Sequence, residues 1–122
     1  MDYKDDFVNE ELVEFDIEGR KFSYKPVTAG EENDWLNEYI VPSEDNKRMI
    51  QDTSKLNKCK VRNLKQVPYT KEDINGLIQV DKGWDQLNIN QRWNVLSKLK
   101  TKIFSDIIIN INRIDNPVKK KS

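Results

Sequence analysis

The chain has 122 residues, a formal net charge of zero, and 34% charged against 36% hydrophobic residues. This length suits one domain with a modest core, and no apolar run approaches the roughly 20 residues that a membrane-spanning helix needs. The sequence contains no histidine and a single cysteine, Cys59. Histidine bases, histidine-ligated metals, Cys/His nucleophiles and four-cysteine zinc sites are therefore excluded within one chain. The composition favours binding over catalysis, and we expect no enzymatic activity, cofactor or metal.

Apolar and acidic residues alternate from Val13 to Glu18, and the alternation resumes after Gly19-Arg20. Such alternation is typical of a half-buried strand. Glycine at the first loop position suits a two-residue type II′ turn, and Pro26 ends the second strand. We therefore predict a β-hairpin within residues 11–27. The predicted cross-strand pairs are Ile17 with Phe22, Phe15 with Tyr24, Glu18 with Lys21 and Glu14 with Lys25.

A helix is predicted to follow over residues 29–41. Thr28 and Glu31 have the spacing of a capping box, in which hydroxyl and carboxylate satisfy exposed amide groups reciprocally. Pro42 is expected to stop the helix, and residues 43–53 show no period and are predicted to be a mobile connection. The apolar stripe of this helix consists of Trp35, Leu36, Tyr39 and Ile40.

Residues 54–67 fit either a helix or a strand. Cys59 and Val61 alternate with basic residues as in a strand, but a strand here lacks an obvious neighbour, so we favour a helix capped by Ser54 and ended by Pro68. Thr70 is predicted to cap a further short helix. Asp73 lies three residues after this cap, and the buried face is expected to hold Ile74, Leu77 and Ile78.

The longest apolar period covers residues 89–114. We predict two helices, the first beginning with Asn88 and Gln91 and the second capped by Thr101, while Ile107-Ile108-Ile109 leaves a strand as the alternative. The expected fold class is α+β, with an N-terminal β-hairpin packed against a mainly α-helical domain of four to five helices. The helices are expected within residues 29–115, and the single domain spans 11–115. Residues 1–10 and 116–122 are predicted to be flexible tails, the second one basic.

Charge is unevenly distributed along the chain. Residues 1–54 carry 15 acidic and 6 basic side chains, a net charge of −9, whereas residues 55–122 carry the reverse and a net charge of +9. The two halves either attract each other within one fold or leave faces that steer partners or bring copies together. The acidic N-terminus does not resemble a signal peptide, so we expect an intracellular protein.

The order of these elements resembles the tail assembly chaperones of long-tailed phages. The resemblance rests on the hairpin segment 15–22, the tryptophan-bearing helix, Trp84-x-x-Leu87, Arg92-x-x-x-Leu96-x-x-Leu99 and the isoleucine-rich helix. It implies a small non-enzymatic protein of the host cytoplasm that binds the tape measure protein, keeps it soluble and assists tail tube assembly. The tail tube protein would be a further partner, and this chain would correspond to the short form of the family. Such chaperones are absent from the finished virion.

Large apolar side chains are the candidate contacts for a partner helix, because aromatic residues dominate recognition of helices in grooves. Trp93 lies on the long apolar stripe, which favours a place in the core. Trp84 follows Gly83 and either fills the core or contacts a partner. The candidate partner-binding residues are Trp84, Trp93, Leu96 and Tyr39.

Two alternatives to a chaperone stay open. A small nucleic-acid-binding regulator would use a basic cluster of Lys58, Lys60, Arg62 and Lys65, although a solvated helix face also explains these charges. A minor structural protein of the tail or neck would be found in purified particles. Carboxylates at Glu31 and Glu32 suit the first turn of a helix better than catalysis, and Cys59 suits a buried apolar position.

Overall fold

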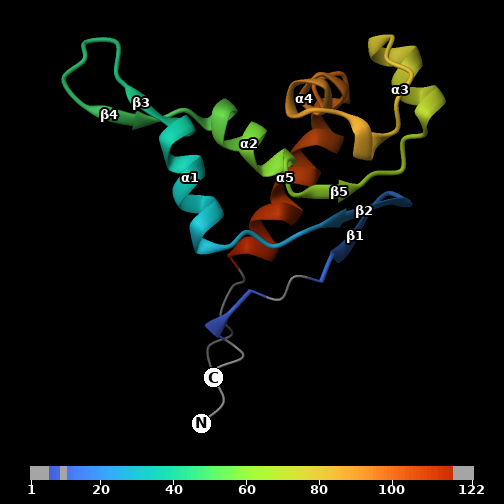
Figure 1. Ribbon diagram of the computed structural model, residues 1–122, viewed down its shortest axis with the longest axis horizontal. Helices are drawn as coiled ribbons and strands as arrows, with labels where there is room; N and C mark the ends of the chain where they lie inside the picture. The colour runs from blue at the N-terminus through green and yellow to red at the C-terminus, as the bar shows by residue number, and fades with distance from the viewer. Residues whose placement is uncertain (1–5, 9–10, 117–122) are drawn as a thin grey trace.

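The computed structural model describes residues 6–8 and 11–116, and the protein has an α+β fold (Figure 1). The predicted tail residues 1–5, 9–10 and 117–122 lie outside the described residues. Strands β1, β2 and β5 form one antiparallel sheet in the order β1-β2-β5, and β3 pairs with β4 in a second. The strands are β1 (Val13–Ile17), β2 (Arg20–Tyr24), β3 (Ile40–Pro42), β4 (Met49–Gln51) and β5 (Leu64–Gln66). The helices are α1 (Ala29–Tyr39), α2 (Thr53–Val61), α3 (Lys71–Ile78), the 3-10 helix η2 (Trp84–Gln86), α4 (Ile89–Leu96) and α5 (Thr101–Asp115).

The predicted hairpin is present, but its turn is one residue earlier than predicted. Ile17 pairs with Arg20, so the loop is Glu18-Gly19, and φ is positive at both loop residues (52° and 85°). Positive φ at both positions is the requirement of a type I′ turn, which glycine meets without steric cost. The Gly19 amide donates to Asp16 Oδ1 at 2.8 Å, which holds the loop in this position. The observed pairs are therefore Phe15 with Phe22, Val13 with Tyr24, Asp16 with Lys21 and Glu14 with Ser23.

Helix α1 begins as predicted and ends earlier. Both hydrogen bonds of the Thr28–Glu31 capping box are present, but the last helical residue is Tyr39. The next two residues are β-branched and enter β3, which pairs with β4. Residues 43–53, predicted to be a mobile connection without a period, contain the strand β4 and the first residue of α2. Trp35 and Tyr39 are buried, whereas Leu36 is exposed.

Residues 54–67 contain both a helix and a strand. Asp52, and not Ser54, caps α2 by accepting from the Lys55 amide at 3.1 Å. The helix ends at Val61, and β5 then pairs with β2, with Tyr24 opposite Leu64. The prediction that a strand here would lack a neighbour is therefore wrong, since its neighbour is the second strand of the N-terminal hairpin.

The helix starts predicted at Thr70 and Asn88 are confirmed at α3 and α4, and the structure forms a capping box at each. Two helices fill the C-terminal third, as predicted, and no strand forms at 107–109. Thr101 is the first residue of α5 and not its cap, because Lys100 occupies the cap position without a side-chain cap hydrogen bond.

The main core lies between the three-stranded sheet and helices α3, α4 and α5. Its centre is fully buried and includes Phe22, Tyr24, Leu64, Ile74 and Ile107. A second, smaller cluster of Trp35, Tyr39 and Cys59 joins α1 to α2. The β3–β4 hairpin projects beyond this smaller cluster (Figure 1). Within the described part of the chain, no helix has both the length and the apolar character needed to cross a membrane.

Candidate protein-binding groove

A groove with a mixed polar and apolar lining lies where α4 turns into α5. Residues 97–100 join the two helices, and the amides of Ser97 and Leu99 donate to carbonyls of α4 at 2.9 and 3.1 Å. This tight link leaves Trp93 and Phe104 half-buried, with their rings in an edge-to-face contact 5.7 Å apart. Leu96 forms the buried floor of the groove.

The groove is small and has both polar and apolar lining residues. Its volume of about 270 Å³ is just below the range of about 300–1,000 Å³ that small-molecule pockets occupy. Ser54 and Asn57 of α2 line its polar side, and Leu99 lines its apolar side. An apolar side chain projecting from a partner helix would find aromatic and aliphatic contacts here, with hydroxyl and amide groups at the rim.

The structure separates the four residues predicted to bind a partner. Trp93 and Leu96 line the groove together. Trp84 is buried, and its indole Nε1 donates to the Leu64 carbonyl at 2.8 Å, so it fills the core and connects η2 to β5. Tyr39 is buried in the smaller cluster, away from the groove. Sequence reasoning missed Ser54 and Asn57, which belong to another helix and carry no local signal of a site.

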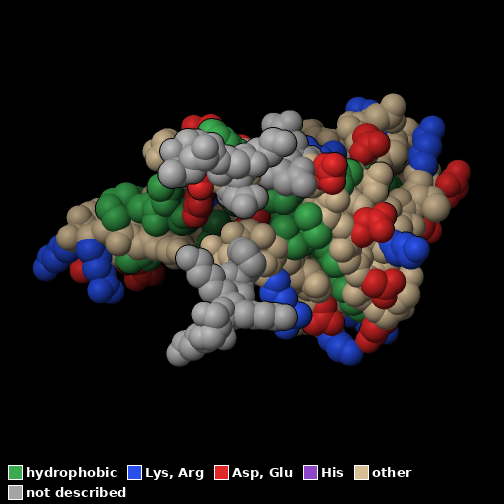
Figure 2. All heavy atoms as spheres, turned by 90° about the horizontal axis from the view of Figure 1, so that it is seen from below, with side chains coloured by type: hydrophobic (Ala, Val, Ile, Leu, Met, Phe, Trp, Pro, Cys, Tyr) green, Lys and Arg blue, Asp and Glu red, His purple; other side chains and the backbone are tan. Residues whose placement is uncertain are grey.

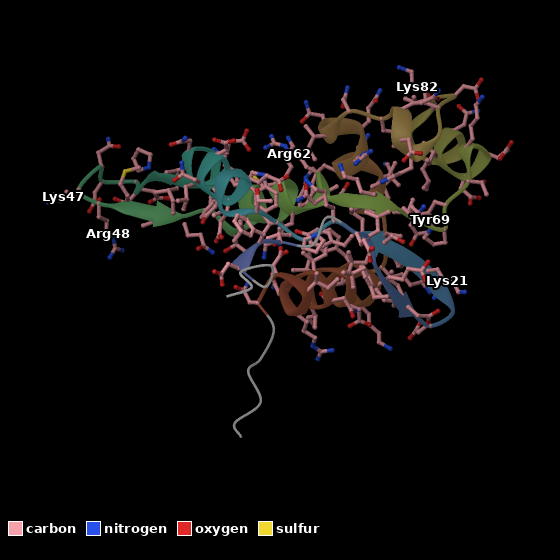
Figure 3. All side chains as sticks on the ribbon, turned by 60° about the horizontal axis from the view of Figure 1, so that its bottom comes forward. Lys21, Lys47, Arg48, Arg62, Tyr69 and Lys82 are labelled. Carbon is pink, nitrogen blue, oxygen red and sulfur yellow. The ribbon has the colours of Figure 1, made fainter. Side chains whose placement is uncertain are left out.

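The four predicted phosphate-binding residues do not share one surface. Lys58 and Arg62 line a separate hollow beside α2, Lys60 contacts the Asn112 side chain of α5, and Lys65 lies on β5 near Arg92. Arg62, which Figure 3 labels, makes a bidentate ion pair with Glu38, with Nη1–Oε2 at 2.7 Å and Nη2–Oε1 at 2.9 Å. One of the four charges is thus already balanced within the protein.

The hollow beside α2 also contains the cysteine. Cys59 Sγ donates to Glu38 Oε2 at 3.0 Å, and burial together with this carboxylate raises the pKa of the thiol to about 12. The hydrogen bond from Arg62 lowers the pKa of Glu38. The thiol therefore stays protonated near neutral pH, which is unfavourable for a nucleophile. Among the described residues, no cluster of three acidic or cysteine side chains is arranged to hold a metal ion.

No protein-family model, curated protein or solved structure matches this chain.

Proposed function

We propose that this protein is a non-enzymatic protein-binding protein that holds an apolar side chain of a partner helix in the groove between α4 and α5. The observation that carries the proposal is the half-exposed aromatic pair Trp93 and Phe104 above the buried Leu96. Half-exposed aromatic side chains in a groove with a polar rim are the usual anchors of protein interfaces.

The particular function we propose is that of a tail assembly chaperone of a long-tailed phage, acting in the host cytoplasm. The support is the resemblance in the sequence pattern of the predicted elements, together with a groove of the size that a helix side chain fills. The partner would be the tape measure protein, and the tail tube protein would be a further one. A single groove gives weak affinity, so several copies along one long partner would be needed to cover it.

Co-expression with the tape measure protein tests this function. We expect the wild-type chain to raise the soluble yield of the tape measure protein. Ser97→Trp places an indole at the rim of the groove and is expected to abolish the gain. Ser105→Trp adds the same side chain at an exposed position of α5 that does not line the groove, and is expected to retain the gain.

The outcomes separate the two parts of the proposal. No gain in yield with the wild-type chain would contradict the chaperone function. An equal gain in soluble yield for the wild type, Ser97→Trp and Ser105→Trp would support a chaperone function but contradict binding in the groove. Recovery of the partner must also be independent of nuclease, since nuclease-sensitive recovery would favour the nucleic-acid-binding alternative.

A further inference from the structure

The β3–β4 arm, defined as residues 40–51, extends away from the rest of the protein (Figures 1 and 2). All three residues of β4 are exposed, with 60% of Met49 and 40% of Ile50 accessible to solvent. Figure 2 shows hydrophobic side chains along the arm, and Figure 3 places Lys47 and Arg48 near its tip. A two-stranded sheet exposed in this way is only marginally stable in water. Within the described part of the chain, apolar surface of the arm therefore stays uncovered.

The hydrogen bonds of the arm show which edge is open. The Asp52 amide donates to Tyr39 O at 2.7 Å, and the Ser43 amide donates to Arg48 O at 2.8 Å. Inward-facing and outward-facing residues alternate in an antiparallel pair, so Arg48, Ile50 and Asp52 direct their backbone groups toward β3. The backbone N–H and C=O groups of Met49 and Gln51 consequently face outward, away from β3.

The opposite edge of the arm is closed. Pro42 has no amide hydrogen, and the Ile40 amide donates to the carbonyl of Leu36 at the end of α1. Proline on an edge strand is a common obstacle to pairing with further strands. Any additional strand is thus directed to β4.

We propose that β4 of a second copy pairs antiparallel with this open edge and joins two arms into a four-stranded sheet. The two-fold axis passes between Ile50 and the Ile50 of the second copy. In this register Met49 of each copy exchanges backbone hydrogen bonds with Gln51 of the other copy. All the outward-facing backbone groups of Met49 and Gln51 are then used. Ile50 lies opposite its counterpart in a non-hydrogen-bonded pair, where side chains approach most closely.

Charge complementarity favours the same register. Arg48 lies opposite Asp52 of the second copy, and the two-fold axis repeats this pair at the other end of the interface. Asp52 caps α2 through Oδ1, and among the described residues no partner of its Oδ2 is seen. A register centred on Met49 would instead place Arg48 opposite Ile50, and one centred on Gln51 would run into α2. One alignment therefore satisfies the hydrogen bonds, the apolar contact and the charges together.

A second copy of this chain fits the edge better than an unrelated extended peptide, because the edge is complementary to itself. The two short strands bury a small area compared with the 1,200–2,000 Å² that stable complexes bury. We therefore expect self-association to be weak and to depend on protein concentration. It does not use the groove between α4 and α5, so it is independent of the proposed function.

A charge exchange tests the register. Arg48→Asp places two Asp–Asp pairs in the homodimer, and Asp52→Arg places two Arg–Arg pairs. Each variant alone is expected to self-associate about tenfold more weakly than the wild type in sedimentation velocity. An equimolar mixture restores both opposite-charge pairs and is expected to recover wild-type association. Failure of the mixture to recover, with both variants folded by circular dichroism, would overturn the proposal.

A second pair of variants avoids the cap of α2, which Asp52→Arg removes. Met49→Pro removes an outward-facing amide hydrogen and is expected to abolish self-association. Met49→Thr keeps that amide and introduces a β-branched side chain, which suits a strand, and is expected to associate like the wild type. A wild-type chain that stays monomeric at every concentration, or a Met49→Pro chain that associates normally, would overturn the pairing of β4.

Discussion

Asp115 connects the C-terminal helix to the N-terminal sheet. Its carboxylate accepts from the Tyr24 hydroxyl at 2.7 Å and from the Val27 amide at 2.9 Å, across about ninety positions of sequence. Burial is the largest influence on this group and raises its pKa, although the two hydrogen bonds and the nearby Lys60 act in the opposite direction. The folded protein thus binds a proton at Asp115 more tightly than the unfolded chain does.

The raised pKa predicts how Asp115 contributes to stability as pH changes. Because the folded pKa lies above the unfolded value of about 3.9, the contribution is greatest at lower pH and is lost as pH rises through the folded pKa. Asp115→Asn cannot titrate. Urea denaturation gives the free energy of unfolding of the wild type and of Asp115→Asn. The difference, wild type minus variant, should therefore fall with rising pH above about 4 and then level off.

The matched control for this pH series is Asp34→Asn, the same change at an exposed position of α1. An equal fall for Asp34→Asn would show that the change from carboxylate to amide by itself, and not the burial of Asp115, causes the pH dependence. A difference for Asp115→Asn that is constant, or that rises with pH, would show that burial does not govern this carboxylate.

At the scale of single elements, caps were predictable because both partners lie within four residues of each other. Thr28, Thr70 and Asn88 all make the cap hydrogen bonds that their spacing predicts. The same reasoning failed at Thr101, where Lys100 takes the cap position. A local sequence pattern predicts a helix start only to within about one residue. At Thr101, a shift of one residue decides whether its hydroxyl can accept from a free backbone amide.

The contrast between Thr70 and Thr101 gives a second prediction. The Thr70 hydroxyl accepts from the Asp73 amide at 3.2 Å, so Thr70→Ala should lower the free energy of unfolding by about 0.5–2 kcal/mol. Thr101→Ala removes no cap and should change it by less than about 0.5 kcal/mol. Thermal and urea denaturation of both variants measure the difference. Equal losses at the two positions would contradict the assignment of Lys100 as the cap.

Strands and the groove were harder to predict, because their partners are distant in sequence. Nothing near Leu64 indicates that it will pair with Tyr24, and nothing near Met49 indicates pairing with Pro42. The hairpin register differed because Gly19 was assigned to the first loop position when it occupies the second. In the groove, an apolar stripe identified Trp93 and Leu96 but could not show that Tyr39 and Trp84 would be covered.

For the whole molecule, part of the charge difference between the two halves is balanced by contacts between them. Glu38 pairs with Arg62, and Glu18 pairs with Lys102, both at 2.7 Å and both joining the acidic half to the basic half. These pairs are exposed, and exposed pairs contribute little to stability. Their main effect is electrostatic, since they reduce the net charge that remains on each half to steer a partner.

Apolar burial is also uneven across the molecule, and this predicts where the fold opens first. Among residues 6–8 and 11–116, thirteen buried residues form the core between the sheet and α3–α5, whereas three form the cluster that holds α1 against α2. Local opening costs less free energy where fewer apolar groups are buried. Amides of α1 and of the β3–β4 arm should therefore exchange with solvent faster than amides of β2 and α5.

Native-state hydrogen exchange measures this difference, in dilute protein so that pairing between arms does not protect β4. We expect protection of α1 to be at least about tenfold below that of β2, which corresponds to about 1.4 kcal/mol in the free energy of opening. Equal protection would mean that α1 opens only when the main core does. The small cluster around Trp35 would then be as strongly coupled to the sheet as α5 is, and the arm would be held by the whole fold and not by one helix pair.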